Sequence, residues 1–302
     1  MTLIVGAVNR RQAVLVSDRR VSWNGRLVDD ESSKAITFLG RDSRLAISFT
    51  GLAQWGDFST RRWIIESLAD EADTHELLAP TIESFTKAAT AKLASLDISV
   101  LAHKFLTIVF VGYLYEDLGS RAVIIIVSNF EDWNGPFSTP GTEFKATWMW
   151  ETRPFLPKAG GCWTGGMAKA LRQDDFITLR TLVRDDKPAE AIVGKAVDAI
   201  RTAADFSAAK GTIGKQCMSI VLPSEISEPG VSEYHSATLS RVMYRPSHVE
   251  ARGGEFGVMS FDGHESGFEV NGVPQVLAGP KRHGNQWCWC ASGKKYGKCH
   301  GR

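Results

Sequence analysis

The sequence lacks a long hydrophobic run, since no stretch reaches the roughly eighteen apolar residues that a membrane-spanning helix needs. Its apolar start, Leu3–Val8, ends in a polar segment and has no basic segment before it, which argues against a secretory signal peptide. Cysteine is scarce and odd in number, with five among 302 residues, so a disulfide framework is not expected. We therefore expect a cytoplasmic protein with reduced cysteines and no membrane span.

An overall charge of either sign is also missing. Lys and Arg total 35 and Asp and Glu total 34, and the resulting +1 argues against a general polyanion binder. The charge is unevenly distributed, because residues 281–302 contain six Lys or Arg and no acidic residue. Residues 1–280 therefore carry −5. The hydrophobic fraction of 43% is ample for a packed core.

Blocks of strands alternate with pairs of helices along the chain. Apolar runs predict a hairpin of Thr2–Val8 with Ala13–Ser17, and further strands at Arg26–Val28, Ala35–Leu39, Arg44–Phe49, Phe105–Leu114, Arg121–Val127, Lys145–Trp150, Cys217–Leu222 and Ala237–Tyr244. Helical spacing predicts helices at Trp55–Ala72, Thr81–Leu96, Asp174–Val183 and Pro188–Ala204. This order favours an α+β fold in which two sheets pack face to face and a helix pair covers each outer side.

Three regions follow from composition. Residues 1–250 contain the predicted strands and helices and form the body. Residues 251–280 are predicted to be a linker or extension, because seven glycines fall there without a clear hydrophobic period. Residues 281–302 are short, basic and rich in cysteine, which predicts a separate small module.

A threonine directly follows the initiator methionine. A small side chain at this position normally permits removal of Met1, which exposes Thr2 with a free α-amine. Such an amine has a reference pKa of about 7.7–8.0, so part of it is neutral at pH 7. A neutral amine beside a hydroxyl is able to take its proton as the hydroxyl oxygen attacks a carbonyl. Thr2 is therefore a candidate nucleophile that carries its own base.

Three further residues accompany Thr2 at suggestive spacings. Asp18 ends the returning strand of the hairpin, which brings it back toward the start of the chain. Lys34 precedes the next strand, where its charge lowers the proton affinity of a nearby hydroxyl while Asp18 orients it. Gly51 ends a strand and offers a backbone N–H to an oxyanion. The alternatives are an Asp18 that caps a turn, a solvated surface Lys34 and a Gly51 that only closes a strand.

These segments resemble the proteasome-type N-terminal nucleophile (Ntn) hydrolases, namely proteasome β-subunits and the bacterial HslV peptidase. The resemblance is carried by the segments Thr2–Gly6, Val14–Arg20, Lys34–Ile36 and Phe49–Ala53. It implies a four-layer αββα fold with Thr2 as nucleophile and its amine as general base. It also implies support from Asp18 and Lys34, an oxyanion donor at Gly51, peptide or protein substrates, and homo-oligomerisation into a ring or spiral.

The resemblance weakens later in the chain. The family carries a Gly-Ser-Gly-like turn after its central strands, and the candidate here is Trp163–Gly166. Its aspartate and serine near the last helix should fall around Asp205–Thr212, where Asp205 and Ser207 are present but at a different spacing. The additional support that these residues give to the amine in the family is therefore not evident in this sequence.

The C-terminal module contains four soft or borderline metal donors, Cys288, Cys290, Cys299 and His300. Three cysteines and one histidine form a closed tetrahedral zinc set, and a module of about twenty residues has too little core to fold without such a metal. The segment resembles the SEC-C motif, which implies structural zinc and a docking role. The alternative is a pair of reactive cysteines in a basic tail.

Two functions are compatible with these features. The first is a threonine-type peptidase or amidohydrolase acting through an acyl-enzyme on Thr2, with a zinc-binding docking tail. The second is a non-catalytic proteasome-like scaffold that recruits protein, ribosome or nucleic-acid partners through its basic aromatic tail. The mature N-terminus discriminates between them, because a retained Met1 blocks the amine.

Overall fold

The computed structural model describes residues 2–251, except 24–25, 31, 101–102, 118, 152–159, 207–208, 210, 238–240 and 245. It also describes the backbone of three short strands at 258–261, 268–270 and 273–275. The predicted zinc ligands Cys288, Cys290, Cys299 and His300 lie outside the described residues.

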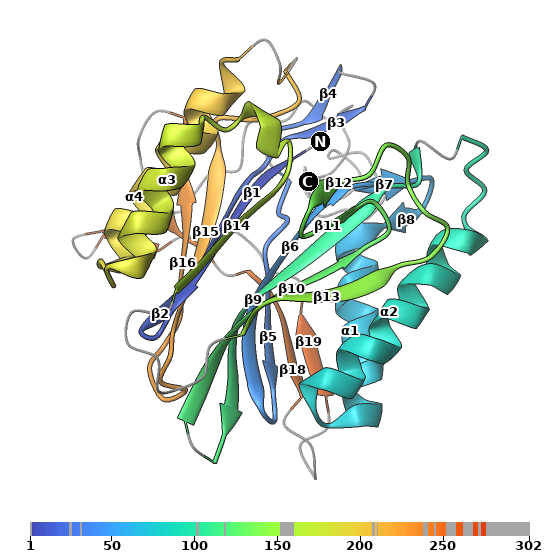
Figure 1. The fold of residues 1–302 in the computed structure, drawn as a ribbon, viewed down its shortest axis with the longest axis horizontal. Coiled ribbons are helices and arrows are strands. Elements are labelled where there is room, and N and C mark those ends of the chain that lie inside the picture. The colour runs from blue at the N-terminus through green and yellow to red at the C-terminus, as the bar shows by residue number, and fades with distance from the viewer. Residues whose placement is uncertain are drawn as a thin grey trace.

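Two large sheets form the centre of the molecule (Figure 1). The six-stranded sheet has the order β14-β1-β2-β15-β16-β17, with bounds Gly160–Gly166, Leu3–Asn9, Gln12–Asp18, Cys217–Pro223, Val231–His235 and Arg241–Met243. The seven-stranded sheet has the order β13-β10-β9-β6-β5-β18-β19, with bounds Lys145–Glu151, Gly119–Ser128, Leu106–Glu116, Ser43–Gly51, Ile36–Gly40, Ser247–Ala251 and Val258–Phe261. Four two-stranded ribbons complete the strands, namely β3 (Val21–Trp23) with β4 (Arg26–Asp29), β7 (Gln54–Trp55) with β8 (Phe58–Ser59), β11 (Glu131–Asp132) with β12 (Gly135–Pro136), and β20 (Phe268–Val270) with β21 (Val273–Gln275).

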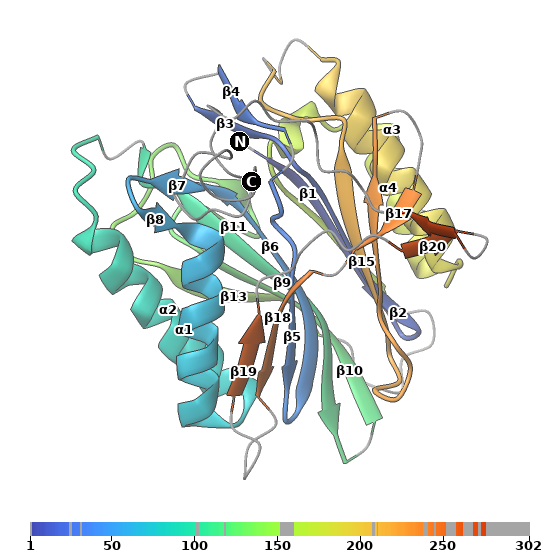
Figure 2. The same cartoon turned by 180° about the vertical axis from the view of Figure 1, so that it is seen from behind.

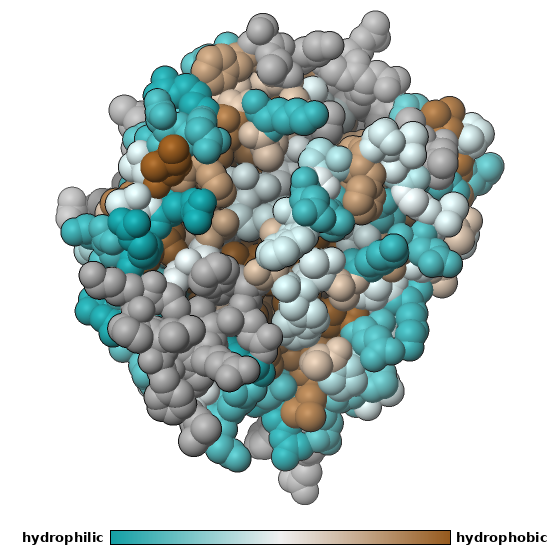
Figure 3. All heavy atoms as spheres, viewed as in Figure 1, coloured by the Kyte–Doolittle hydropathy of each residue, from teal (hydrophilic) through white to brown (hydrophobic). Residues whose placement is uncertain are grey.

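A helix pair covers the outer face of each large sheet. Helices α1 (Thr60–His75) and α2 (Leu78–Ser95) share an apolar cluster with the seven-stranded sheet, in which Phe85 meets Phe110 edge to face. Helices α3 (Gln173–Arg184) and α4 (Ala189–Ala204) share a second cluster with β1 and β2. The outward surfaces of α2 and α3 are mostly hydrophilic (Figure 3), as expected for amphipathic helices on an apolar sheet.

A third apolar cluster lies between the two sheets. It combines Ile4 and Leu15 of the six-stranded sheet with Val109 and Val111 of the seven-stranded sheet, all fully or almost fully buried. The strands β1 and β9 are thus buried on both faces, which explains their continuous apolar sequences. The structure confirms a mixed fold of helices and sheets, with the predicted strand and helix blocks in the predicted order.

The first hairpin forms as predicted and fixes the start of the chain. β1 and β2 pair antiparallel in a register that sets Ile4 opposite Ser17. Asn9 stabilises the turn, because its side-chain oxygen accepts hydrogen bonds from the backbone N–H groups of Arg11 and Gln12. Asp18, at the end of β2, is thereby brought back beside Thr2 and Leu3.

Some sequence predictions were wrong. Helix α1 begins at Thr60 instead of Trp55, because Trp55 belongs to the ribbon β7–β8 that precedes the helix. The segment Ala237–Tyr244 is not one strand that ends the body: the strand there is only Arg241–Met243, and β18 follows. Strand β14 was not predicted, because its sequence GGCWTGG contains four glycines, which weaken every strand signal.

At the β5 edge, the seven-stranded sheet is extended by two strands from the end of the body (Figure 2). β18 pairs parallel with β5, and β19 pairs antiparallel with β18, so the predicted extension at 251–280 contributes a strand to the large sheet. Parallel pairing requires a long crossover, which here contains most of the chain. In the part of the chain that the structure describes, no helix is long and apolar enough to cross a membrane.

Candidate active site

Thr2 and Asp18 meet at the open end of the first hairpin. Asp18 accepts hydrogen bonds from the backbone N–H of Leu3 at 2.8 Å and from the N–H groups of Gly214 and Arg20, both at 3.1 Å. Its side chain is fully buried. A carboxylate with three backbone donors has a fixed orientation, so Asp18 is a rigid acceptor next to the first strand.

Lys34 reaches the Thr2 hydroxyl from the segment before β5. Its Nζ donates to Thr2 Oγ1 at 2.5 Å and to the backbone carbonyl of Arg20 at 2.5 Å. It also lies 3.9 Å from Asp18 Oδ2 and donates to the Asp18 carbonyl at 3.3 Å. Only 1% of Lys34 is exposed, so it is not the solvated surface lysine of the alternative interpretation. The structure therefore brings Thr2, Asp18 and Lys34 together.

Burial sets the electrostatics of this group. Desolvation raises the pKa of Asp18, and the nearby Lys34 ammonium and three backbone donors oppose that rise. Desolvation lowers the pKa of Lys34, and the Asp18 carboxylate opposes that change. Each charge thus offsets the desolvation cost of the other, and removal of either one leaves a buried charge unpaired.

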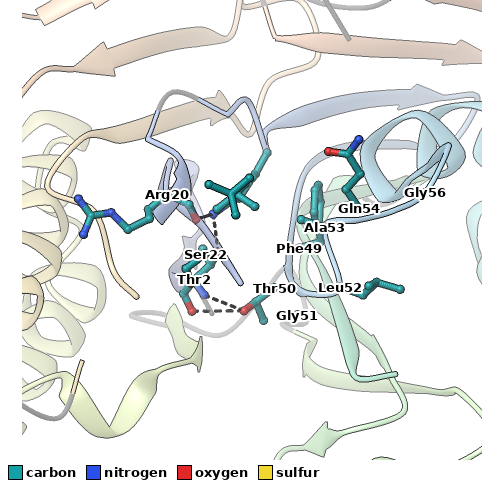
Figure 4. Close-up of a pocket in the computed structure, with 13 residues that line it drawn as sticks. Thr2, Arg20, Ser22, Phe49, Thr50, Gly51, Leu52, Ala53, Gln54 and Gly56 are labelled. Carbon is teal, nitrogen blue, oxygen red and sulfur yellow. Dashed lines mark hydrogen bonds between the residues drawn. The ribbon is translucent and has the colours of Figure 1, made fainter. Parts of the chain in front are cut away.

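A cavity of about 260 Å³ opens beside the Thr2 hydroxyl (Figure 4). Gly51 lines it together with the backbone that leaves β6, and its φ of +106° belongs to the region that glycine tolerates. A Cβ at Gly51 would lie 2.2 Å from the Phe105 carbonyl oxygen, which leaves no space for a side chain. The cavity is further lined by Thr2, Arg20, Val21, Ser22, Val28, Lys34, Phe49, Thr50, Leu52, Ala53, Gln54 and Gly56.

The cavity walls carry little free charge. Arg20 donates from Nε and from Nη2 to the two carboxylate oxygens of Asp30, at 2.8 Å and 2.7 Å, and its guanidinium points away from the cavity (Figure 4). The opposite wall consists of the apolar Phe49, Leu52 and Ala53 with the neutral amide of Gln54. This composition suits an uncharged substrate group.

Thr50 was not predicted as a site residue. Its Oγ1 accepts a hydrogen bond from the backbone nitrogen of Thr2 at 3.1 Å and donates to the Thr2 carbonyl oxygen at 3.3 Å (Figure 4). It is 2% exposed and stands at the end of β6, directly before Gly51. Its proximity to Thr2 depends on the packing of the two sheets, so the sequence gives no signal beyond its position next to Gly51.

The predicted turn at Trp163–Gly166 is the end of β14. Met167 donates its N–H to the Thr2 carbonyl oxygen at 3.0 Å, and Gly166 has a φ of +73°. A Cβ at Gly166 would lie 2.0 Å from the Thr2 carbonyl oxygen, so only glycine fits there. Glu131, also missed from the sequence, accepts from the Gly166 N–H at 3.4 Å and is 5% exposed.

Asp205, one possible support near the last helix, is not brought to Thr2. Asp205 caps the end of α4, and its carboxylate pairs with Lys215 at 2.6 Å on the surface. Ser207 lies outside the described residues. Within the described part of the chain there is also no group of three or more His, Cys, Asp or Glu able to hold a metal ion.

Comparisons with known proteins give a motif match and similarities to solved structures. Residues 285–302 match the family model described as the SEC-C motif. The chain is similar to the solved structure of Anbu (ancestral beta-subunit) from Yersinia bercovieri, with 12% sequence identity and a TM-score of 0.48. That similarity covers 74% of this chain and 81% of Anbu. No curated protein matches the sequence.

Proposed function

We propose that this protein is a threonine-type N-terminal nucleophile hydrolase that cleaves peptide or related amide bonds after removal of Met1. The observation that carries the proposal is the 2.5 Å hydrogen bond from the buried Lys34 ammonium to Thr2 Oγ1, with Asp18 behind it. If Thr2 were an ordinary surface residue and Asp18 only capped a turn, a desolvated lysine at the Thr2 hydroxyl would have no purpose. The cavity beside that hydroxyl provides room for a substrate.

The reaction then proceeds in two steps. The α-amine of Thr2 takes the hydroxyl proton while Oγ1 attacks the substrate carbonyl carbon, and Lys34 stabilises the negative charge that develops on Oγ1. The Gly51 N–H is the proposed donor to the tetrahedral oxyanion. The protonated amine gives its proton to the leaving amine, which departs and leaves an ester on Thr2. Water, deprotonated by the same amine, hydrolyses this ester and regenerates the hydroxyl.

Three further assignments complete the proposal. The two facing sheets with outer helix pairs correspond to the four-layer αββα arrangement of Ntn hydrolases, and a homo-oligomeric ring or spiral accompanies that assignment. Residues 1–250 are the main part of the hydrolase body, to which β19 (Val258–Phe261) adds a strand, and residues 281–302 are a docking module. In that module Cys288, Cys290, Cys299 and His300 would hold structural zinc, a donor set that fits the metal and leaves no open position for catalysis.

The proposal is tested first at the N-terminus and then at the hydroxyl. Intact-mass measurement of the native protein should show loss of Met1, which frees the amine. Thr2→Ala should then abolish turnover of fluorogenic peptides and covalent labelling by a β-lactone, whereas Thr2→Ser should retain part of both, because serine keeps the hydroxyl.

Two outcomes would contradict this function. Met1 retained in the native protein excludes the amine as a base. Peptide turnover that survives in Thr2→Ala excludes Thr2 as the nucleophile.

A further inference from the structure

We propose that Thr50, backed by the buried carboxyl group of Glu131, is the positioning residue that holds the Thr2 α-amine for proton transfer. This inference rests on the proposed function and assigns the support of the amine to the seven-stranded sheet and the β11 ribbon, instead of the end of α4.

The contacts of Thr50 determine which way the Thr2 nitrogen is oriented. In the described structure this nitrogen is an amide joined to Met1, and its N–H points to Thr50 Oγ1 at 3.1 Å. After removal of Met1, an amine at the same place donates one hydrogen to Thr50. The hydroxyl hydrogen of Thr50 is engaged by the Thr2 carbonyl oxygen, so Thr50 is left as an acceptor toward the amine. The single lone pair of the neutral amine is then free to take the proton of Oγ1.

Glu131 lies behind this pair and approaches it by two routes. It accepts a hydrogen bond from the Thr107 hydroxyl, and Thr107 is the direct cross-strand partner of Thr50 in the β6–β9 ladder. It also accepts from the N–H of Gly166, the residue whose backbone packs on the Thr2 carbonyl oxygen. A carboxylate in this position stabilises a positive charge on the Thr2 amine.

The position of Glu131 is fixed by its own strand end. Ser128 Oγ accepts hydrogen bonds from the backbone N–H groups of Phe130 and Glu131, both at 2.9 Å, and lies 2.7 Å from Thr107 Oγ1. Burial raises the pKa of Glu131, and the bonds from Thr107 and Gly166 oppose that rise. A buried carboxyl group with no cation among these partners is costly for stability alone, which favours a role toward the nearby amine.

The experiment compares Thr50→Val, Thr50→Ala, Thr50→Ser and Glu131→Gln with wild type. The matched control is Ser48→Ala, which removes another fully buried hydroxyl from β6, one that has no hydrogen-bond partner. The readouts are the rate of β-lactone labelling of Thr2 against pH, followed by intact mass, and kcat and KM for a fluorogenic peptide. Labelling reports on the amine without knowledge of the natural substrate. Urea unfolding shows which variants fold.

Thr50→Val and Thr50→Ala should each lower the labelling rate and kcat about tenfold or more with little change in KM, because general-base transfer depends on orientation. Thr50→Ser should keep most of the rate. In Thr50→Val and Glu131→Gln the acid-side midpoint should move to lower pH, since the ammonium loses an acceptor or a negative neighbour. Ser48→Ala should match wild type.

The proposal is overturned if folded Thr50→Val and Thr50→Ala label at the wild-type rate, or if the midpoint is unchanged in Glu131→Gln. That result is distinct from failure of the proposed function, in which wild type is not labelled at Thr2 or turnover survives in Thr2→Ala.

Discussion

At the scale of single residues, the candidate site depends on a buried ion pair. Burial disfavours the charged form of both members, so it shifts their pKa values in opposite directions. Asp18 has a pKa raised by burial, so its charged form costs stability above its usual value of 3.8. Lys34 has a pKa lowered by burial, so its charged form costs stability below its usual value of 10.5. Under the proposed function, the Thr2 hydroxyl needs a cation beside it, and that cation needs a counter-charge.

This arrangement predicts a pH-dependent defect in Lys34→Met. Loss of the ammonium leaves Asp18 buried without a cation, and the expected cost at pH 7 is about 3–5 kcal/mol. The folded-state pKa of Asp18 then rises further above its unfolded value of 3.8. The folded state binds the extra proton, so the variant should gain stability as the pH falls from 7 toward 5. Urea unfolding at both pH values, with wild type beside it, measures this change.

The double variant Asp18→Asn/Lys34→Met is the matched control. It should recover part of the stability at pH 7, though not all, because the amide nitrogen of asparagine cannot accept the bonds that Asp18 receives from both sides. Its stability should be nearly independent of pH between 5 and 7. A Lys34→Met variant as stable as wild type at pH 7 would show that Asp18 and Lys34 are not electrostatically coupled.

At the scale of secondary-structure elements, the end of β14 determines how close the Thr2 backbone lies to the seven-stranded sheet. Gly166 has a φ of +73°, and its missing side chain leaves room for the Thr2 carbonyl oxygen. Met167 follows and donates to that same oxygen. The end of β14 thus holds Thr2, the residue before β1, from one side, while Thr50 of β6 holds it from the other.

Gly166→Ala should therefore displace Thr2. An alanine with positive φ costs about 1–2 kcal/mol, and its Cβ collides with the Thr2 carbonyl oxygen at 2.0 Å. We expect a lower melting temperature and a rate of Thr2 labelling by a β-lactone reduced at least about tenfold. Gly194→Ala is the control, because nothing lies within 4 Å of its added Cβ inside α4. That change should stabilise the protein by roughly 0.5–1 kcal/mol and leave labelling intact. Wild-type labelling in Gly166→Ala would contradict this role of β14.

The same strand explains where sequence reasoning succeeded and failed. Long apolar segments such as β1, β9 and β10 were predicted closely, because burial on both faces leaves a continuous apolar sequence. Strand β14 was missed because pairing with β1 holds it in the sheet, and its glycine-rich sequence gives no local signal of that pairing. Among the candidate site residues, Thr2, Asp18 and Lys34 were predicted from their spacing. Thr50 meets Thr2, and Glu131 meets Gly166, only through contacts between distant strands.

At the scale of the whole molecule, the sequence joins two parts with opposite charge and different chemistry. The first 280 residues carry −5 and include the Thr2 site, whereas residues 281–302 carry six positive charges and the segment that matches the SEC-C motif. The body has its own three apolar clusters, which supply a packed core. A module of about twenty residues is too short for such a core, which is why we propose that zinc holds it.

Zinc content and Thr2 chemistry should therefore be separable. Wild type should bind one equivalent of zinc, and Cys288→Ser/Cys290→Ser should lose it, because two of the four proposed thiolate and imidazole ligands are gone. Cys162→Ser, which changes a half-buried cysteine in β14, is the control and should keep the metal. Metal analysis with urea unfolding and β-lactone labelling of each variant measures all three properties.

The double variant should unfold and label as wild type does, since a closed zinc set offers no position for substrate. Zinc retained in the double variant would refute this ligand set, and a loss of Thr2 labelling together with the metal would show that the tail contributes to the catalytic body.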